Sequence, residues 1–169
     1  MKRILFVCHG NICRSPMAEY IMKDLVRRAG AENQISIRSA ATSAEELGNP
    51  VYLPARQTLT RHGVPYGNHC ARRLTAQDYS AYDLFIGMDK ANMRNMCRIL
   101  GETPKVRFIC CWTMPDVPGR RWPIPGIPEI LRPHTGTFWR GAAGCWTSCC
   151  SKSPCCGRPG PQQGQIGSG

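Results

Sequence analysis

A cysteine, an arginine and a serine follow the first apolar run of the chain at a spacing that suits phosphate chemistry. In the stretch VCHGNICRSP, Arg14 comes six residues after Cys8 and is followed by Ser15. The five residues between thiol and guanidinium can wrap once around a tetrahedral dianion, over which Arg14 can close as a bidentate fork. The amides of such a loop and the start of a following helix add partial positive charge. The spacing therefore predicts a phosphate-binding loop.

The same loop would prepare Cys8 for nucleophilic chemistry. Amides, helix dipole and guanidinium all favour the thiolate, and a thiolate under a bound phosphate is placed for in-line attack on phosphorus. Ser15 could hydrogen-bond the sulfur or the loop, Gly10 permits close backbone approach, and Asn11 tolerates a left-handed conformation. Because the motif is short, Cys8 could also be a small buried residue at the end of a strand.

The elements around the loop predict an α/β fold, an open parallel four-stranded sheet flanked by helices. We expect strands at 3–8, 34–40, 83–88 and 105–109, helices at 16–29, 53–62 and 90–100, and a short helical turn at 75–80. In such sheets ligands bind beyond the carboxyl ends of the strands, and the loop follows the first strand at that end.

The composition changes beyond residue 109. Seven of the 11 cysteines and all four tryptophans follow residue 105, and residues 105–169 hold eight basic and two acidic residues, so that they carry +6 of the net charge of +11. Neither helical nor strand periodicity continues, and residues 151–169 are of low complexity. We therefore expect a domain body at 1–109 and a divergent, disordered tail at 110–169.

Several function classes are not expected. The chain shows no secretory signal and no run of membrane-spanning length, so we expect a cytoplasmic protein without a membrane partner, whose cysteines are thiols. The cysteine spacing matches no zinc site, and neither a metal nor another cofactor is expected. Basic and aromatic residues do not interleave in the first hundred positions, so nucleic acid is not expected despite the charge.

The stretch VCHGNICRSPMAE resembles the signature V-C-x-G-N-x-C-R-S-P of the low-molecular-weight protein tyrosine phosphatase family. The resemblance continues through SAATSAEELGNPV and RHGVPYGNHCARRLTAQDYSAYDLFIGMDKANMRNM, and covers about residues 2–108. It implies hydrolysis of phosphotyrosine-containing proteins through a phosphocysteine formed on Cys8. It also implies a phosphate-binding loop of His9, Gly10, Asn11, Ile12, Cys13, Arg14 and Ser15, in which Arg14 is the phosphate ligand and Asn11 and Ser15 stabilise the loop.

The resemblance bears on single residues as well. Ile12 stands where the related arginine phosphatases typically have threonine, which favours phosphotyrosine. Cys13 matches a loop cysteine that can form a reversible disulfide with the nucleophile, although simple packing explains it equally well. His9 is expected to face solvent and not to act as a base, and Asp89 to cap a helix. Surface positions are expected for His69, Arg72 and Arg73, which also match the family.

The general acid of that family is missing from this chain. The family has an Asp-Pro motif after the fourth strand, whereas no Asp-Pro occurs here, and Asp116, between Pro115 and Val117, does not match it. Read in a shifted frame, the possible codons of WPIPGIPEIL permit Ala-Asp-Pro-Trp-Tyr-Thr-Gly-Asp-Phe. Those of LRPHTGTFWRGAAGC permit Glu-Ala-Thr-Tyr-Arg-Asp-Val-Leu-Glu-Gly. We hypothesise a frameshift near Ile109, real or a sequencing error, that replaces the acid loop and last helix.

Three functions stay open at this point. The first is a phosphotyrosine phosphatase whose activity is impaired by the loss of the general-acid aspartate. The second is a non-catalytic phosphate-binding module, since binding needs the loop and Arg14 but not the acid. The third is an arsenate reductase of the same fold, which requires two further cysteines placed for a disulfide cascade. Cys70 and Cys97, 27 residues apart, do not look like that pair.

Overall fold

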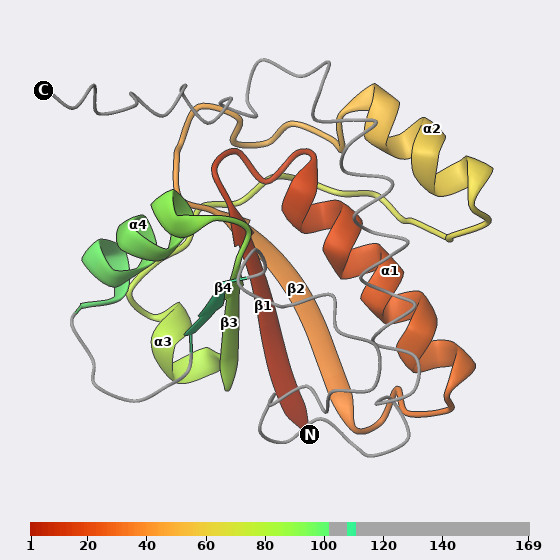
Figure 1. Ribbon diagram of the computed structural model, residues 1–169, viewed down its shortest axis with the longest axis horizontal. Helices are drawn as coiled ribbons and strands as arrows, with labels where there is room; N and C mark the ends of the chain where they lie inside the picture. The colour runs from red at the N-terminus through yellow and green to blue at the C-terminus, as the bar shows by residue number, and fades with distance from the viewer. Residues whose placement is uncertain (102–107, 111–169) are drawn as a thin grey trace, which may run out of the picture.

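Parallel strands side by side form the centre of the molecule (Figure 1). The computed structural model describes residues 1–101 and 108–110, and the expectations for 102–107 and 111–169 lie outside that part. The strands are β1 (Lys2–Cys8), β2 (Ile35–Ala41), β3 (Leu84–Gly87) and β4 (Phe108–Cys110), in the order β2-β1-β3-β4. All pairs are parallel, with Ile4 of β1 opposite Ile37 and Leu84. The expected open parallel α/β sheet flanked by helices is confirmed.

The helices begin close to the positions expected from the sequence. They are α1 (Arg14–Arg28), α2 (Leu53–Arg61), α3 (Asp78–Ala81) and α4 (Lys90–Leu100). Helix α1 starts two residues before the expected Pro16, with Cys13 as its N-cap residue, and the Met17 amide donates to the Cys13 carbonyl at 3.1 Å. Arg14 and Ser15 therefore belong to the first turn of α1 and not to the loop.

The two faces of the sheet bury alternate residues of β1. Ile4 and Phe6 point to the face covered by α1, whereas Leu5 and Val7 point to the face covered by α4. Alternation of this kind follows from the period of two in a strand, and burial on both faces gives a continuous apolar run. Each of these four side chains is at most 2% exposed, and each such burial contributes about 1.5–3 kcal/mol.

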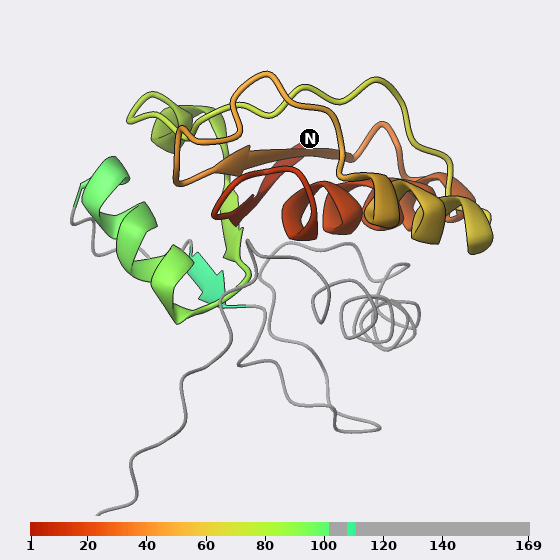
Figure 2. The same ribbon diagram turned by 90° about the horizontal axis from the view of Figure 1, so that it is seen from above.

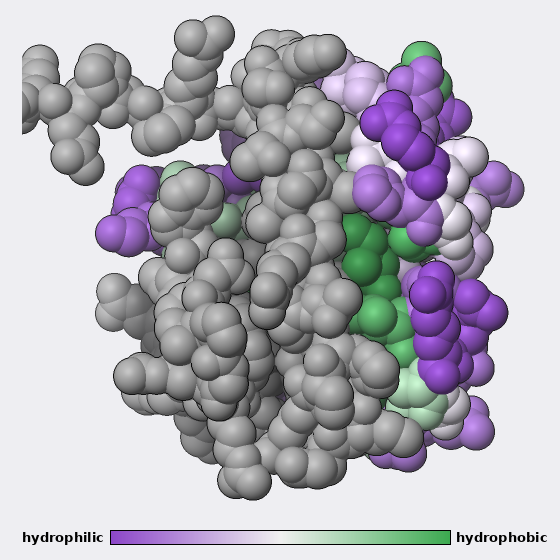
Figure 3. All heavy atoms as spheres, turned by 45° about the vertical axis from the view of Figure 1, so that its right-hand side comes forward, coloured by the Kyte–Doolittle hydropathy of each residue, from purple (hydrophilic) through white to green (hydrophobic). Residues whose placement is uncertain are grey.

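Helix α2 packs against α1 and not against the sheet. Met17 and Tyr20 of α1 meet Ala55 and Leu59 of α2 in a separate buried cluster. Figure 2 shows both helices on one side of β1 and β2, with α3 on the other. Figure 3 views the molecule from the side of α1 and α2, where polar surface borders an apolar strip. The segment between β2 and α2 lies next to the loop after β1, since the Thr42 amide donates to the Cys8 carbonyl at 2.9 Å and the Tyr52 amide donates to the Ile12 carbonyl at 2.7 Å.

The starts of β1 and β3 are joined by a reciprocal contact between Arg3 and Asp83. The Arg3 amide donates to Asp83 Oδ2 at 2.8 Å, and the Asp83 amide donates to the Arg3 carbonyl at 2.8 Å. The hydrogen bond from the Arg3 backbone holds the pKa of Asp83 below its ordinary value of 3.8. The contact is therefore strongest when the carboxyl group is ionised.

This contact predicts a specific loss of stability in acid. A lowered pKa in the folded state stabilises the fold above pH 3.8, and this stabilisation disappears as the pH falls through the lower folded value. We expect Asp83→Asn to lose less stability than the parent chain between neutral pH and about pH 3. Urea denaturation midpoints across that range measure it. Parallel curves for the two proteins would contradict the prediction.

None of the helices within residues 1–101 combines the length and apolar character needed to cross a membrane. Residues of the described part also form no cluster of three or more His, Cys, Asp or Glu side chains suited to a metal ion.

Candidate active site

The predicted phosphate loop lies at the carboxyl end of the sheet, between the last residue of β1 and the first turn of α1 (Figure 1). Asn11 has a φ of 58°, a left-handed conformation that asparagine tolerates. Cys8, Asn11, Ile12 and Cys13 are all buried, so the loop is packed into the molecule. Helix α1 begins directly after this loop, so the positive end of the helix dipole points toward the loop.

Two donors, one from the loop and one from the first turn of α1, approach the sulfur of Cys8. The Asn11 amide donates to Cys8 Sγ at 3.2 Å, and Ser15 Oγ lies 3.0 Å from the same sulfur. Ser15 Oγ also accepts a hydrogen bond from Asn11 Nδ2 at 2.8 Å, which leaves its own proton for the sulfur. An N–H and an O–H directed at one sulfur stabilise negative charge on it. The predicted role of Ser15 has a geometric basis.

Asn11 connects the loop to two other segments, strand β2 and the segment after α2. Its Nδ2 donates to Ser39 Oγ at 2.8 Å, and its Oδ1 accepts from the Arg72 amide at 3.2 Å. Its carbonyl oxygen lies 2.6 Å from His69 Nε2, and because a carbonyl only accepts, this nitrogen carries the proton. Asn11 is fully buried, so each of these bonds fixes a group that water cannot reach. The left-handed turn of the loop is thus held from several sides.

The network continues from Ser39 to a buried carboxylate. Ser39 Oγ donates to Glu19 Oε2 at 2.5 Å, and Lys23 of the same helix pairs with Glu19 Oε1. Glu19 is 5% exposed, and a carboxylate at that depth is stable only when it is paired and hydrogen-bonded. Glu19 and Lys23 therefore support the Ser39 hydroxyl that holds Asn11.

Arg14 bridges the loop and helix α4. Its Nη1 lies 2.6 Å from Asp89 Oδ2, while Asp89 Oδ1 accepts from the Asn92 amide at 2.7 Å. The expected capping role of Asp89 is confirmed, and the second carboxylate oxygen gives it a further role that the sequence did not predict. The Arg14 side chain is 15% exposed, and the ion pair anchors the guanidinium beside the loop.

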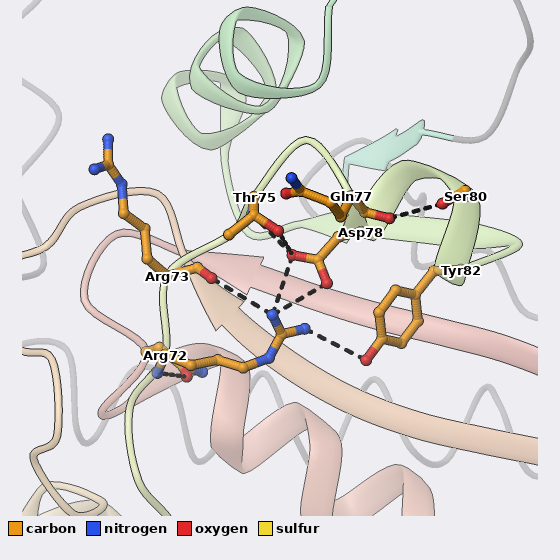
Figure 4. Close-up of polar contacts among 8 residues, drawn as sticks. Arg72, Arg73, Thr75, Gln77, Asp78, Ser80 and Tyr82 are labelled. Carbon is orange, nitrogen blue, oxygen red and sulfur yellow. Dashed lines mark hydrogen bonds and ion pairs between the residues drawn. The ribbon is translucent and has the colours of Figure 1, made fainter.

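A second ion pair anchors the segment that holds Asn11 (Figure 4). Arg72 Nη1 lies 3.1 Å from both oxygens of Asp78, and Nη2 donates to the hydroxyl of Tyr82 at 3.3 Å. Asp78 Oδ2 also accepts from the amide of Thr75 at 2.8 Å. Burial opposes the Arg72 charge, but the Asp78 carboxylate outweighs it and the pKa of Arg72 is raised. The side chain thus fixes the backbone whose amide bonds to Asn11.

Loss of this ion pair is expected to reach the phosphate loop. Replacing Arg72 with methionine leaves Asp78 without its guanidinium, and we expect a loss of about 1–3 kcal/mol of unfolding free energy in urea. Binding of oxyanions by the loop should weaken as well, because the Arg72 amide that orients Asn11 is loosened. Arg73→Met is the matched control, since Arg73 is exposed and should change stability by less than about 0.5 kcal/mol. Equal losses in the two variants would contradict the prediction.

The structure brings together four of the predicted loop residues, Cys8, Asn11, Arg14 and Ser15. Ile12 is buried, and its carbonyl accepts from the Tyr52 amide at 2.7 Å. Cys13 packs in the cluster between α1 and α2, which agrees with its packing alternative and leaves its redox role a prediction. Gly10 lies against the side chain of Glu46, which leaves no room for a Cβ at this position. The side chain of His9 is partly exposed, and its Nε2 lies 3.1 Å from Glu45 Oε2.

The surface roles expected for His69 and Arg72 are wrong. Both are partly buried, and both hold Asn11 through hydrogen bonds from the segment after α2. Arg73 is exposed as expected. Sequence reasoning also missed Ser39 and Glu19 as members of the site. The available signal for Glu19 was its acidic side chain among the apolar residues Met17, Ala18 and Tyr20 of α1.

Taken together, the parallel sheet and the loop after β1 define an α/β domain with a cysteine at the base of the loop for which phosphate binding is predicted. Residues 3–125 match the family described as low molecular weight phosphotyrosine protein phosphatase, so the chain belongs to that family. The match extends beyond the region of about 2–108 over which the resemblance was expected.

Individual relatives agree with this assignment. The low molecular weight phosphotyrosine protein phosphatase of Gallus gallus is 43% identical over 98 residues, which cover 58% of this chain and 61% of the relative. The low molecular weight protein-tyrosine-phosphatase YfkJ of Bacillus subtilis is 39% identical over 101 residues, 60% of this chain and 65% of the relative. The crystal structure of YfkJ superposes with a TM-score of 0.67 at 29% identity, covering 90% of this chain and 98% of YfkJ. The chain thus matches about three-fifths of the length of these relatives' sequences.

Proposed function

We propose that this chain is a phosphotyrosine phosphatase that hydrolyses phosphate monoesters through a phosphocysteine intermediate. The observation that supports the proposal most directly is the sulfur of Cys8 with the Asn11 amide at 3.2 Å and the Ser15 hydroxyl at 3.0 Å. These donors stabilise a thiolate. The Arg14 guanidinium, at the start of α1, is suited to bind a phosphate dianion above it. The relatives are named as phosphatases of phosphotyrosine, and these names suggest the substrate class.

The reaction proceeds in two displacements. Cys8 Sγ attacks phosphorus, the bond from phosphorus to the tyrosine oxygen breaks, and the leaving phenoxide takes a proton. Water then attacks phosphorus, the P–S bond breaks, and inorganic phosphate and the Cys8 thiolate are released. The Arg14 guanidinium stabilises the equatorial oxygens in both steps, and the Ser15 hydroxyl stabilises the departing sulfur in the second. No metal or cofactor takes part in this scheme.

Residues 1–109 supply the nucleophile and the phosphate site in this proposal, and residues 110–169 replace the acid loop and last helix. The proton donor for the phenoxide stays unassigned, because no Asp-Pro occurs in the sequence. For this reason we expect this chain to hydrolyse phosphotyrosine slowly. A thiolate nucleophile requires a reducing compartment, and we propose the cytoplasm.

The two alternatives make different demands. A phosphate-binding module would hold a phosphopeptide without releasing phosphate, and an arsenate reductase would oxidise thiols in the presence of arsenate. The names of the relatives favour neither alternative. Arsenate reduction also finds no support in the described cysteines, since Cys70 lies exposed after α2 and Cys97 lies on α4.

Release of inorganic phosphate from a phosphotyrosine peptide tests the proposal. We expect release that vanadate inhibits, because vanadate is a tetrahedral oxyanion that fits the same loop. A phosphoarginine peptide of the same sequence should be a poorer substrate, since Ile12 stands where the related arginine phosphatases typically have threonine. Binding of the phosphotyrosine peptide with no phosphate release at any enzyme concentration would favour the binding module and overturn the proposal.

A further inference from the structure

The segment after β2 lies along one side of the predicted phosphate loop and is hydrogen-bonded to it. The Thr42 amide donates to the Cys8 carbonyl at 2.9 Å, and the Ser43 amide donates to the His9 carbonyl at 2.9 Å. These bonds fix residues 43–49 (SAEELGN) beside the first half of the loop. The Glu45 amide in turn donates to Ser43 Oγ at 3.2 Å, which orders the turn that follows.

Two carboxylates of this segment lie against the loop. Glu45 Oε2 accepts from His9 Nε2 at 3.1 Å, and its side chain is 71% exposed. The side chain of Glu46 passes over Gly10, where a Cβ would stand 2.9 Å from Glu46 Cγ. We name Glu45 and Glu46 the acidic rim. Because one residue pairs with His9 and the other covers Gly10, both lie at the same side of the loop.

The charge of the acidic rim is not cancelled by its own segment. Residues 43–49 contain no lysine or arginine, and Glu46 Oε2 accepts from the neutral amide of Asn49 at 2.7 Å. The hydrogen bond from His9 holds the pKa of Glu45 below its ordinary value of 4.5. On the other side of the loop Asp89 pairs with Arg14, and the exposed Lys90 follows it. The chain carries +11 overall, yet the charged side chains of residues 43–49 beside the loop are both acidic.

We propose that the acidic rim makes the site selective for phosphotyrosine peptides with lysine or arginine next to the phosphotyrosine, and that acidic flanking residues are disfavoured. The inference rests on the proposed function. A peptide whose phosphate lies over Cys8 must pass its neighbouring residues over the edge of the loop. Charges at that edge act within a screening length of about 8–10 Å, so they reach the adjacent side chains of the peptide.

Binding of labelled peptides to the full-length Cys8→Ser protein tests the acidic rim without turnover. Three phosphotyrosine peptides are compared that differ only in lysine, alanine or glutamate at the flanking positions. We expect the lysine peptide to bind about 5–10-fold more tightly than the glutamate peptide at low salt, with the ratio approaching one near 0.5 M salt. Glu45→Lys should reduce this ratio to about 2-fold or invert it.

Glu32→Lys is the matched control, because it makes the same change of charge at an exposed position before β2, at the opposite end of the sheet. The ratio should persist in this variant. The preference for the lysine peptide could disappear in both variants, or the three peptides could bind equally well to the parent protein. Either result would overturn the proposed selectivity of the acidic rim but not the proposed function. Failure of every phosphotyrosine peptide to bind would overturn the proposed function together with it.

Discussion

Replacing Cys8 with serine is expected to abolish phosphotyrosine hydrolysis while the loop still binds oxyanions. A serine hydroxyl has the same branching as the thiol and is smaller, but it is not ionised at neutral pH, so the attacking group is lost. We expect the rate to fall by roughly 10⁴–10⁶-fold, the range seen when a nucleophile is removed from a working site. Single-turnover release of phosphate measures the loss, and phosphate binding by calorimetry measures what remains.

The surroundings of Cys8 explain why binding should survive. The Ser15 hydroxyl and the Asn11 amide lie within 3.2 Å of Sγ and can bond to an oxygen in its place. Arg14 keeps its ion pair with Asp89. Cys97→Ser, on α4, is the control and should retain full activity. Substantial hydrolysis by Cys8→Ser would mean that another group attacks phosphorus.

The local parts of the site were predictable from the sequence. Cys8, Asn11, Arg14 and Ser15 lie within one short stretch, and their spacing alone indicates a loop between a strand and a helix. The cap of α4 was predictable for the same reason, since Asp89 lies three residues before the amide that it accepts from. In each case the residues that interact are close in sequence, so the local backbone conformation alone brings them together.

The support of the loop was not predictable, because it comes from distant segments. Ser39 is 28 residues from Asn11, and His69 is 58 residues away. Only the parallel register, which places the end of β2 beside the end of β1, brings Ser39 under the loop. An arginine such as Arg72 gives no sequence signal that separates a buried ion pair from a solvated side chain. A surface assignment therefore failed there.

Restoring the shifted reading frame after Ile109 is expected to raise phosphotyrosine turnover by roughly 10²–10⁴-fold, the usual contribution of a general acid. The shifted codons permit an aspartate at the junction of Pro123 and Ile124, followed by proline, which is the family's acid motif. A carboxylic acid there would protonate the leaving phenoxide and later accept a proton from the attacking water. Steady-state kinetics of the two chains, with Cys8 intact in both, measure the gain.

The size of the gain should depend on the leaving group. An aryl phosphate with an acidic phenol needs no proton in the first step, so the printed chain and the restored chain should differ little in phosphorylation of Cys8 by such a substrate. With phosphotyrosine the difference should be large, and replacing the restored aspartate with asparagine should remove it. A gain that is equal for all leaving groups would point instead to better folding, which urea denaturation of the two chains would reveal. A coding frame without an Asp-Pro at that junction would defeat the frameshift hypothesis itself.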